Sequence, residues 1–432
     1  MENNITKELL AKVGTTFISG SGALSLLPAL LRERKIHSAF LIYDKNTYAV
    51  AGKAVDELLS GAGIAVKDCL FNDSHLEPNE KAVGEAIMKL DACVDAVIGV
   101  GSGVINDISK IVANVSRKPY VIVATAPSMD GYASATSSMC LSGLKVSIPS
   151  KCPDVILGDT EILRDAPTKM MLAGLGDMLA KYIAICDWRI SSIINGENFN
   201  EDIAKKVRES LRKCVSNADA LLCREEEATE AVFEGLALCG VAMKLAGCSR
   251  PASGAEHYIS HIWDMRGEEF GTHTDLHGIQ CAVGTYISAS VYEMLTRIKP
   301  NREKALAYTE GFSYAEWATA LKELLGHGAD AMIALEKKEG KYDKARHAQR
   351  LECIIERWDD ILAVIYEEIP PISELNELYE RVGLPRTMKE IGLDDKLLQM
   401  SFKASKDIRD KYVLSRLCHD LGVAEELLVK LV

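Results

Sequence analysis

The sequence predicts an α/β domain with a parallel sheet over residues 1–166, followed by an all-helical domain over residues 167–432. Two observations predict this division. In the first part, short apolar runs alternate with segments of helical period, which is typical of parallel strands joined by helical crossovers. In the second part only helical patterns remain, for example over residues 201–223, 225–247 and 345–369.

Each element of the first domain has its own signal in the chain. Apolar runs predict strands near residues 15–20, 38–44, 64–73, 97–101, 119–124 and 154–163. Between most of these strands, apolar residues recur at helical spacing, so we expect helices near residues 24–35, 49–63, 79–93 and 104–115. After the strand at 119–124 we expect a polar loop up to residue 135, and the last clear strand is the one at 154–163.

The stretch Val97–Lys110 carries the most distinctive pattern of the first domain. A buried strand breaks at Gly99, Gly101 and Gly103 and continues as a helix. Glycines let the backbone approach an anion, and the start of a helix offers unpaired N–H groups, so the pattern suits a phosphate-binding loop. Because Val104 stands where G-x-G-x-x-G ends in glycine, a tight strand-to-helix turn without a ligand is the alternative.

Asp44 ends one of the predicted strands. Ligands of parallel sheets bind beyond the carboxyl ends of the strands, where Asp44, the glycines of 99–103 and the loop 125–131 all emerge. A carboxylate there can accept hydrogen bonds from ribose hydroxyls, and its charge repels the 2′-phosphate of NADP. We therefore expect NAD(H) to be preferred over NADP(H). The alternative is that Asp44 only ends its strand and caps the next turn.

Four of the nine histidines lie between residues 257 and 277: His257, His261, His273 and His277. His257 and His261 are four residues apart and share one face of a predicted helix, while His277 begins the next apolar helix. We expect Asp177 to stand at the head of a helix, after two glycines. A carboxylate and imidazoles from separate helices can bind one divalent ion and leave a position open for substrate. The alternative is a set of hydrogen-bonded interhelical histidines with a capping aspartate.

The composition narrows the classes of partner. A formal net charge of −12 argues against nucleic acid or an anionic membrane. No apolar run approaches the roughly 18 residues of a membrane span, and the N-terminus shows no signal peptide. The 12 cysteines form no C-x-x-C pair, and many stand in apolar helical segments. This pattern predicts free thiols in a reducing compartment, the cytoplasm.

Five motifs follow one another in the order GVGSGVINDISK, TAPSMDGYAS, AGLGDMLAKY, SGAEHYISHIWD and HGIQCAVGT. They resemble the dehydroquinate synthase-like and iron-containing alcohol dehydrogenase superfamily, and within it the bacterial sn-glycerol-1-phosphate dehydrogenases. The resemblance spans nearly the whole chain. It implies that the α/β domain binds a dinucleotide across its parallel sheet and that the helical domain binds a metal ion.

The resemblance also implies roles for single residues. The family's metal ligands, one Asp and two His, correspond to Asp177, His257 and His277. Its cofactor-binding positions correspond to Gly101, Ser102, Gly103, Asp107, Thr125 and Ser128, to which we add Asp44. Asp130 corresponds to an acidic residue near the substrate, and His261 is our candidate for the proton relay. The alternative for Asp107 is an ion pair with Lys110 within one helix.

The activity implied by the resemblance is the reversible, metal-dependent reduction of dihydroxyacetone phosphate by NAD(P)H to sn-glycerol-1-phosphate, in phospholipid metabolism. Zinc, nickel and iron all suit an Asp/His/His set. Positive charge must hold the substrate phosphate, and Lys145, Lys181 and Arg250 stand beside the motifs. We expect a homo-oligomer, in the first instance a homodimer.

Three other functions are possible on the same sequence. A glycerol or other polyol dehydrogenase is the main alternative. A dehydroquinate synthase-type lyase is disfavoured, because that group usually has glutamate at the position of Asp177. A nucleotide sensor without enzymatic activity is disfavoured because it has no reason to keep the ligand set.

Overall fold

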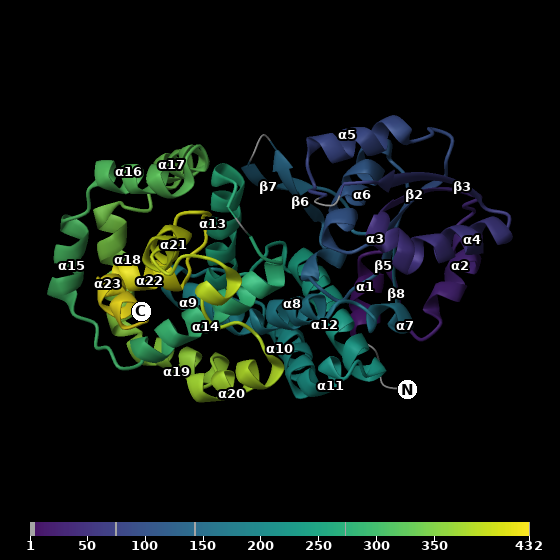
Figure 1. Ribbon diagram of the computed structural model, residues 1–432. Helices are drawn as coiled ribbons and strands as arrows, with labels where there is room; N and C mark the ends of the chain where they lie inside the picture. Colours follow the sequence, from purple (N-terminus) through teal and green to yellow (C-terminus); the bar gives the residue numbers. More distant parts are fainter. Residues whose placement is uncertain (1–4, 74–75, 142–143, 273, 432) are drawn as a thin grey trace. The chain divides into compact units, whose positions relative to one another are not determined.

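The computed structural model describes residues 5–73, 76–141, 144–272 and 274–431, and Figure 1 labels its helices and strands. The chain packs into two compact units. The first unit runs to residue 178 and includes residues 206–248, and the second comprises residues 179–205 and 249–432. The predicted order, a parallel α/β region followed by a helical region, is confirmed. The domain boundary proposed between residues 166 and 167 stays a prediction.

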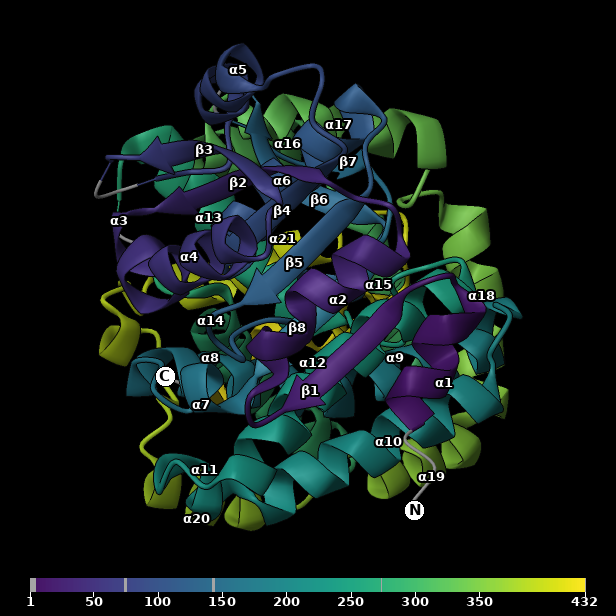
Figure 2. The same cartoon turned by 90° about the vertical axis from the view of Figure 1, so that its right-hand side faces the viewer.

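Six parallel strands form the sheet of the first unit, in the spatial order β1-β8-β5-β4-β2-β3, and Figure 2 shows them from β3 to β1. Their bounds are β1 (Thr16–Gly20), β2 (Ser38–Asp44), β3 (Ala65–Phe71), β4 (Ala96–Gly101), β5 (Tyr120–Ala124) and β8 (Val155–Asp159). Each lies within or beside an apolar run that predicts a strand. The central strands are apolar throughout because helices cover both faces of the sheet.

Helices of the first unit pack on both faces of this sheet. On one face, Leu27 and Leu31 of α2 and Val55 and Leu59 of α4 are buried against the strands. On the other face, the ring of Phe233 in α12 would lie 2.2 Å from a Cβ added to Gly158 of β8, so only glycine fits this contact. The bounds are α1 (Ile5–Lys12), α2 (Leu27–Glu33), α3 (Lys45–Thr47), α4 (Lys53–Gly61), α5 (Glu80–Lys89), α6 (Gly103–Ser116), α7 (Thr160–Leu163), α11 (Ala218–Leu222) and α12 (Glu226–Ala246), with short turns η1 (Ala23–Leu26), η2 (Tyr48–Gly52) and η3 (Asp130–Ala133).

An antiparallel hairpin in the first unit is absent from the sequence-based expectations. Its strands are β6 (Thr136–Leu141) and β7 (Leu144–Pro149). The sequence analysis assigned no element to residues 136–153, so it missed this hairpin. Serine, threonine and glycine are frequent in this segment, so it lacks the continuous β-branched run that predicts a buried strand.

Asp177 does not head a helix, and that prediction is also wrong. α8 (Thr168–Leu179) runs through Gly174 and Gly176 and places Asp177 in its last turn. Gly174 serves packing here and does not end the helix, because a Cβ at this position would stand 1.8 Å from the carbonyl oxygen of Pro127. The glycine lets the loop after β5 lie directly on α8.

The second unit is built from helices, as predicted. α13, α16, α17 and α21 share a core that contains the buried residues Ile262, Leu321, Met332 and Ala404. The bounds are α9 (Lys181–Asn195), α13 (Ala255–Phe270), α14 (His277–Leu295), α15 (Arg302–Glu310), α16 (Tyr314–Leu325), α17 (Gly328–Glu339), α18 (Lys344–Glu356), α19 (Trp358–Glu368), α20 (Ile372–Val382), α21 (Leu397–Ser405), α22 (Leu414–Asp420) and α23 (Ala424–Leu428), with η4 (Lys389–Ile391) and η5 (Val429–Leu431). α10 (Glu201–Ser216) contributes residues to both units. Within the described ranges, no helix is both long and apolar enough to cross a membrane.

Candidate active site

The predicted phosphate loop lies where the order of the strands reverses. The chain moves from β2 outward to β3 and returns on the other side of β2 to form β4. Ile42 pairs with Gly99, and continuing this register by two residues brings Asp44 level with Gly101. Gly101 also pairs with Ala124, so Thr125 follows at the same edge. Such a reversal at the carboxyl ends of parallel strands is where open α/β sheets bind ligands.

The glycines at positions 99, 101 and 103 differ in whether close packing requires them. A Cβ added to Gly101 would stand 2.6 Å from the Cβ of Ile105, and one added to Gly99 would stand 2.8 Å from the Oγ of Ser109. These two glycines let α6 pack closely on β4. At Gly103 the nearest side-chain atom would be 3.6 Å away, which is ordinary contact. Packing therefore explains the first two glycines but does not require the third.

The start of α6 suits an anion. Ser102 is the N-cap residue, but its side chain caps no backbone N–H. Its hydroxyl lies 2.5 Å from the hydroxyl of Ser128. The first N–H groups of a helix have no partner within the helix, and they combine with its dipole to favour negative charge.

Lys110 holds the loop that carries the predicted residues Ser128 and Asp130. Its ammonium group donates hydrogen bonds to the Gly131 carbonyl at 2.6 Å, the Ser134 hydroxyl at 3.1 Å and the Thr136 carbonyl at 3.2 Å. Burial lowers the pKa of Lys110, and the charge of Asp107 opposes this shift. The oxygen of Asp107 lies 3.9 Å from that ammonium, so the predicted ion pair exists at long range. The main partners of Lys110 are loop atoms.

Thr125, Ser128 and Asp130 are buried side chains of the loop after β5, at 7 %, 7 % and 9 % exposure. The backbone N–H of Asp130 donates a hydrogen bond of 2.9 Å to the carboxylate of Asp177. The loop thus orients one of the predicted metal ligands. This link could not be predicted, because it joins residues 47 positions apart through a backbone group.

Asp44 caps the helical turn that follows β2. Its carboxylate accepts a hydrogen bond of 2.8 Å from the Thr47 N–H, and the Thr47 hydroxyl accepts one of 3.0 Å from the Asp44 N–H. This reciprocal arrangement is a capping box. The alternative role of Asp44, capping the turn after its strand, is therefore present in the fold. The contact of Asp44 with a ribose stays a prediction.

Among the described residues, one group of side chains has the geometry of a metal site. Asp177, His257, His277 and Cys281 each offer one ligand atom, and these atoms all lie within 4.8 Å of one another. Asp177, His257 and Cys281 are buried and His277 is half-buried. The predicted trio is therefore brought together, and a fourth residue joins it. His277 and Cys281 are four residues apart on α14, which is the signal by which Cys281 could have been found.

Two further residues orient the imidazoles. The Nδ1 of His257 lies 2.7 Å from a carboxylate oxygen of the fully buried Glu256, and the Nδ1 of His277 lies 3.3 Å from the Ser260 hydroxyl. An imidazole that donates through Nδ1 carries its lone pair on Nε2. Such outer partners fix the tautomer and ring orientation of metal-binding histidines. The sequence analysis missed both residues, since each acts only through a neighbouring histidine.

Buried carboxylates also hold the start of α13. The Gly254 N–H donates to Glu256 at 2.8 Å, and the Ala255 N–H donates to Asp187 at 2.7 Å. Burial is the main reason that the pKa of Asp187 rises to about 7. These bonds set the position of the first turn of α13, which carries His257.

His261 lies beside the group of four ligand atoms but does not belong to it. It is one turn from His257 on α13, and its ring centroid is 6.3 Å from that of His257 and 5.7 Å from that of His277. It is half-buried. This placement agrees with the expectation that His261 acts near the metal without binding it, and its catalytic role stays a prediction. His273 lies outside the described residues.

Of the three basic residues considered for the substrate phosphate, Arg250 and Lys181 donate hydrogen bonds to protein groups. Arg250 is fully buried and donates to both carboxylate oxygens of Glu197, at 2.8 and 2.5 Å, and to the Tyr412 carbonyl at 2.7 Å. Lys181 is fully buried and donates to the Ala252 carbonyl at 3.1 Å. The contacts of Arg250 give it a structural role. The side chain of Lys145 lies outside the described part.

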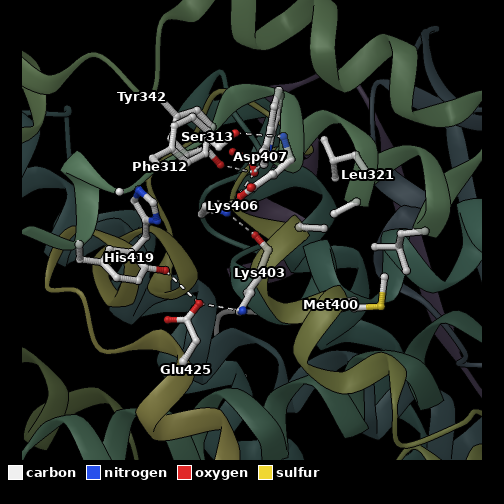
Figure 3. Close-up of a pocket in the computed structure, with 17 residues that line it drawn as sticks. Phe312, Ser313, Leu321, Tyr342, Met400, Lys403, Lys406, Asp407, His419 and Glu425 are labelled. Atoms are coloured by element: carbon white, nitrogen blue, oxygen red, sulfur yellow. Dashed lines mark hydrogen bonds and ion pairs between the residues drawn. The ribbon is translucent and has the colours of Figure 1, made fainter.

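A second polar cluster lies around a cavity of about 400 Å³ in the second unit. Figure 3 shows His419 beside the stacked rings of Phe312 and Tyr342, with Lys406 and Asp407 nearby. Asp407 is buried and ion-paired with Arg416 at 2.7 Å and with Lys406 at 3.1 Å. None of the sequence-predicted site residues lines this cavity.

Comparisons with known proteins identify the family of this chain. The sequence profile of the iron-containing alcohol dehydrogenase family matches residues 18–167. The chain is 31 % identical to the glycerol-1-phosphate dehydrogenase (NAD(P)+) of Bacillus velezensis, over 69 % of this chain and 80 % of that protein. It is 35 % identical to the protein of the same name from Methanosarcina mazei, over 62 % of this chain and 73 % of that protein.

Solved structures share the fold at low sequence identity. The iron-containing alcohol dehydrogenase of Thermococcus thioreducens superposes with a TM-score of 0.63 at 14 % identity, over 97 % of this chain and 98 % of that one. The glycerol dehydrogenase of Schizosaccharomyces pombe gives a TM-score of 0.60 at 17 % identity, over 96 % and 90 %. These likenesses establish the fold.

Proposed function

We infer the function from one premise: the chain belongs to the family of glycerol-1-phosphate dehydrogenases (NAD(P)+), within the iron-containing alcohol dehydrogenases. We propose that it catalyses the reversible reduction of dihydroxyacetone phosphate by NAD(P)H to sn-glycerol-1-phosphate. The observation that carries this proposal is the group formed by Asp177, His257 and His277. Three residues from separate sequence motifs have ligand atoms within 4.8 Å of one another.

The cofactor would lie on the carboxyl edge of β2, β4 and β5. Its pyrophosphate would meet the start of α6, where Gly101, Ser102 and Gly103 form the turn. Asp44 stands level with Gly101 on the neighbouring strand, and its carboxylate would accept hydrogen bonds from the ribose. Thr125 and Ser128 line the next strand end, and Asp107 lies one turn along α6. The bound cofactor supplies the hydride.

The donor set fits one divalent ion. One carboxylate oxygen and two imidazole nitrogens suit zinc, nickel or iron, and each imidazole is oriented by a partner at Nδ1. Asp177, His257 and His277 would hold the ion. When bound, such an ion supplies Lewis-acid polarisation of a carbonyl oxygen.

Residues of the chain itself orient the metal ligands, hold the loop near the substrate and deliver a proton. Glu256 and Ser260 keep the imidazoles of His257 and His277 in one orientation. Lys110 fixes the loop that carries Asp130, which we place near the substrate. His261 holds a proton at a ring nitrogen and delivers it to the alkoxide oxygen that forms when hydride is transferred.

The free thiols and the absence of C-x-x-C pairs support a reducing compartment, and we propose the cytoplasm. A homodimer is proposed on the family resemblance alone.

The test supplies dihydroxyacetone and its phosphate separately to the purified enzyme with NADH and resolves the handedness of the product. We expect the phosphate to be the far better substrate, since each charge-assisted hydrogen bond contributes roughly 1.5–3 kcal/mol. Equal turnover of both substrates would favour a glycerol or other polyol dehydrogenase. A product that is purely sn-glycerol-3-phosphate would overturn the assigned handedness, and no net oxidation of NADH would favour a lyase or a sensor.

A further inference from the structure

Cys281 is the member of the ligand group that the family resemblance does not assign. It lies one turn after His277 on α14 and is fully buried. Its sulfur is 3.5 Å from the Nε2 of His277 and 4.0 Å from the Nδ1 of the same ring. The sulfur is therefore closer to Nε2 than to Nδ1 of His277, and it is Nδ1 that contacts the Ser260 hydroxyl. The same sulfur lies within 4.8 Å of the ligand atoms of Asp177 and His257.

This separation matches two ligands on one ion. Zinc binds thiolate sulfur at about 2.3 Å and imidazole nitrogen at about 2.0–2.1 Å, so at a tetrahedral angle the two atoms stand about 3.6 Å apart. The observed distance from Sγ to Nε2 is 3.5 Å. The i, i+4 spacing on a helix brings both side chains to the same face without backbone strain.

We propose that the sulfur of Cys281 is a fourth protein ligand of the divalent ion, so that the site is built from Asp177, His257, His277 and Cys281. The proposal rests on the metal site of the proposed function and extends it. Two anionic ligands then balance the charge of a divalent ion. A thiolate is a soft ligand, so the fourth residue shifts the preference of the site toward zinc and away from hard cations such as magnesium.

A plain hydrogen bond between the Cys281 thiol and His277 has a similar length and is the competing explanation. The two differ in what happens when a metal ion binds. A ligand sulfur forms a bond to the ion that is visible by spectroscopy, whereas a hydrogen-bonded thiol beside the site does not.

The experiment uses the full-length protein, stripped of metal and loaded with cobalt(II). We expect one equivalent to bind and to show a sulfur-to-cobalt charge-transfer absorption. Cys281→Ala should lose that absorption and bind the ion at least about 10–100-fold more weakly, the loss typical of removing even an outer partner. Cys69→Ala is the matched control, because Cys69 is equally buried but lies on β3. It should keep both properties.

Two results would contradict the proposal that Cys281 is a metal ligand. Cobalt bound by the wild-type protein without the charge-transfer absorption, and with unchanged affinity in Cys281→Ala, would overturn the role of Cys281 and leave the three-residue site standing. No cobalt binding by the wild-type protein would overturn both this proposal and the metal site of the proposed function. Circular dichroism of the metal-free variants establishes that they are folded, and Cys281→Ser repeats the test with a smaller change of shape.

Discussion

Two buried polar clusters, the one around the cavity and the one that contains the histidines, use their charges differently. Around the cavity, Asp407 accepts hydrogen bonds from the side chains of Tyr342 at 2.7 Å and Trp317 at 3.0 Å, and it pairs with Arg416 and Lys406. Burial by itself would raise the pKa of Asp407, but Lys406 and Arg416 outweigh it, so the pKa lies below its usual value. The protein itself supplies the cations for this carboxylate.

The histidine cluster gathers ligand atoms. Its members contribute a carboxylate oxygen, two imidazole nitrogens and a thiol sulfur to one small volume. Their outer atoms are bound to Glu256 and Ser260. The difference shows that burial of polar groups is not by itself a sign of function. A cluster whose charges balance within the protein stabilises the fold, whereas a cluster of converging ligand atoms suits an external cation.

The largest expected effect separates the two histidines of α13. His257→Ala should abolish metal retention and lower kcat/KM about 10³-fold or more, since metal polarisation contributes several kcal/mol. His261→Ala should keep the metal and lose activity by about 10²–10⁴-fold. Elemental analysis and steady-state kinetics check both. His327→Ala, at an exposed histidine paired with Glu269, is the control. Full activity in a rigorously metal-free sample would contradict the metal assignment.

The second prediction concerns the stability of the cavity cluster. Asp407→Asn should destabilise the fold by about 3–5 kcal/mol, because it leaves Arg416 and Lys406 without their buried counter-ion. Metal content should not change. Denaturant unfolding measures the loss. A stable variant with altered metal binding would show that the two clusters are not as distinct as we describe.

The role of Asp407 can also be tested by comparing how the stabilities of the wild type and of Asp407→Asn depend on pH. Because the folded-state pKa of Asp407 is lowered, its contribution is complete above the unfolded pKa of about 3.9 and is lost as the pH falls through the folded value. The wild type should therefore lose more stability than Asp407→Asn on acidification below about pH 4. Parallel acid-unfolding curves for the two proteins would show that this carboxylate does not contribute.

The third prediction tests the orientation of His257. Glu256→Gln keeps the oxygen that contacts Nδ1 of His257 but removes the negative charge that makes this imidazole more basic. It should therefore weaken metal binding, by up to about 10–100-fold, the range seen for changes to outer partners of metal-bound histidines. Competition with a chelator measures the affinity. The fold should persist, because the glutamine oxygen can still accept the hydrogen bond from the Gly254 N–H. Unchanged affinity would show that Glu256 only holds the start of α13.

The smallest expected effect concerns Asp44. Asp44→Asn keeps a residue that caps helices well but removes the charge, so it should move the preference toward NADP(H) by a modest factor at little cost in stability. Asp44→Ala should shift the preference similarly and also lose about 0.5–2 kcal/mol through the missing cap. The ratio of kcat/KM for NADH and NADPH is the measurement. An unchanged ratio in both variants would assign Asp44 to the capping box alone.

The sequence by itself determined the elements and the ligand types. All six sheet strands could be predicted, because apolar runs buried on both faces have a local signature. The i, i+4 spacing of His257 and His261 and the place of His277 at a helix start could also be read locally, and both are confirmed. The hairpin of β6 and β7 could not, because its residues lack that signature.

Only the tertiary structure decided which partners meet. The glycines before Asp177 suggest a helix boundary when only the sequence is considered. In the structure α8 continues through Gly174, where any side chain would collide with the carbonyl oxygen of Pro127. The pairing of His277 with Cys281 follows from their spacing on α14, but only the tertiary structure brings this pair to the ligand atoms of Asp177 and His257. Lys110 likewise serves a loop more than 20 residues away in sequence. Such contacts depend on the packing of distant segments, which local propensity does not encode.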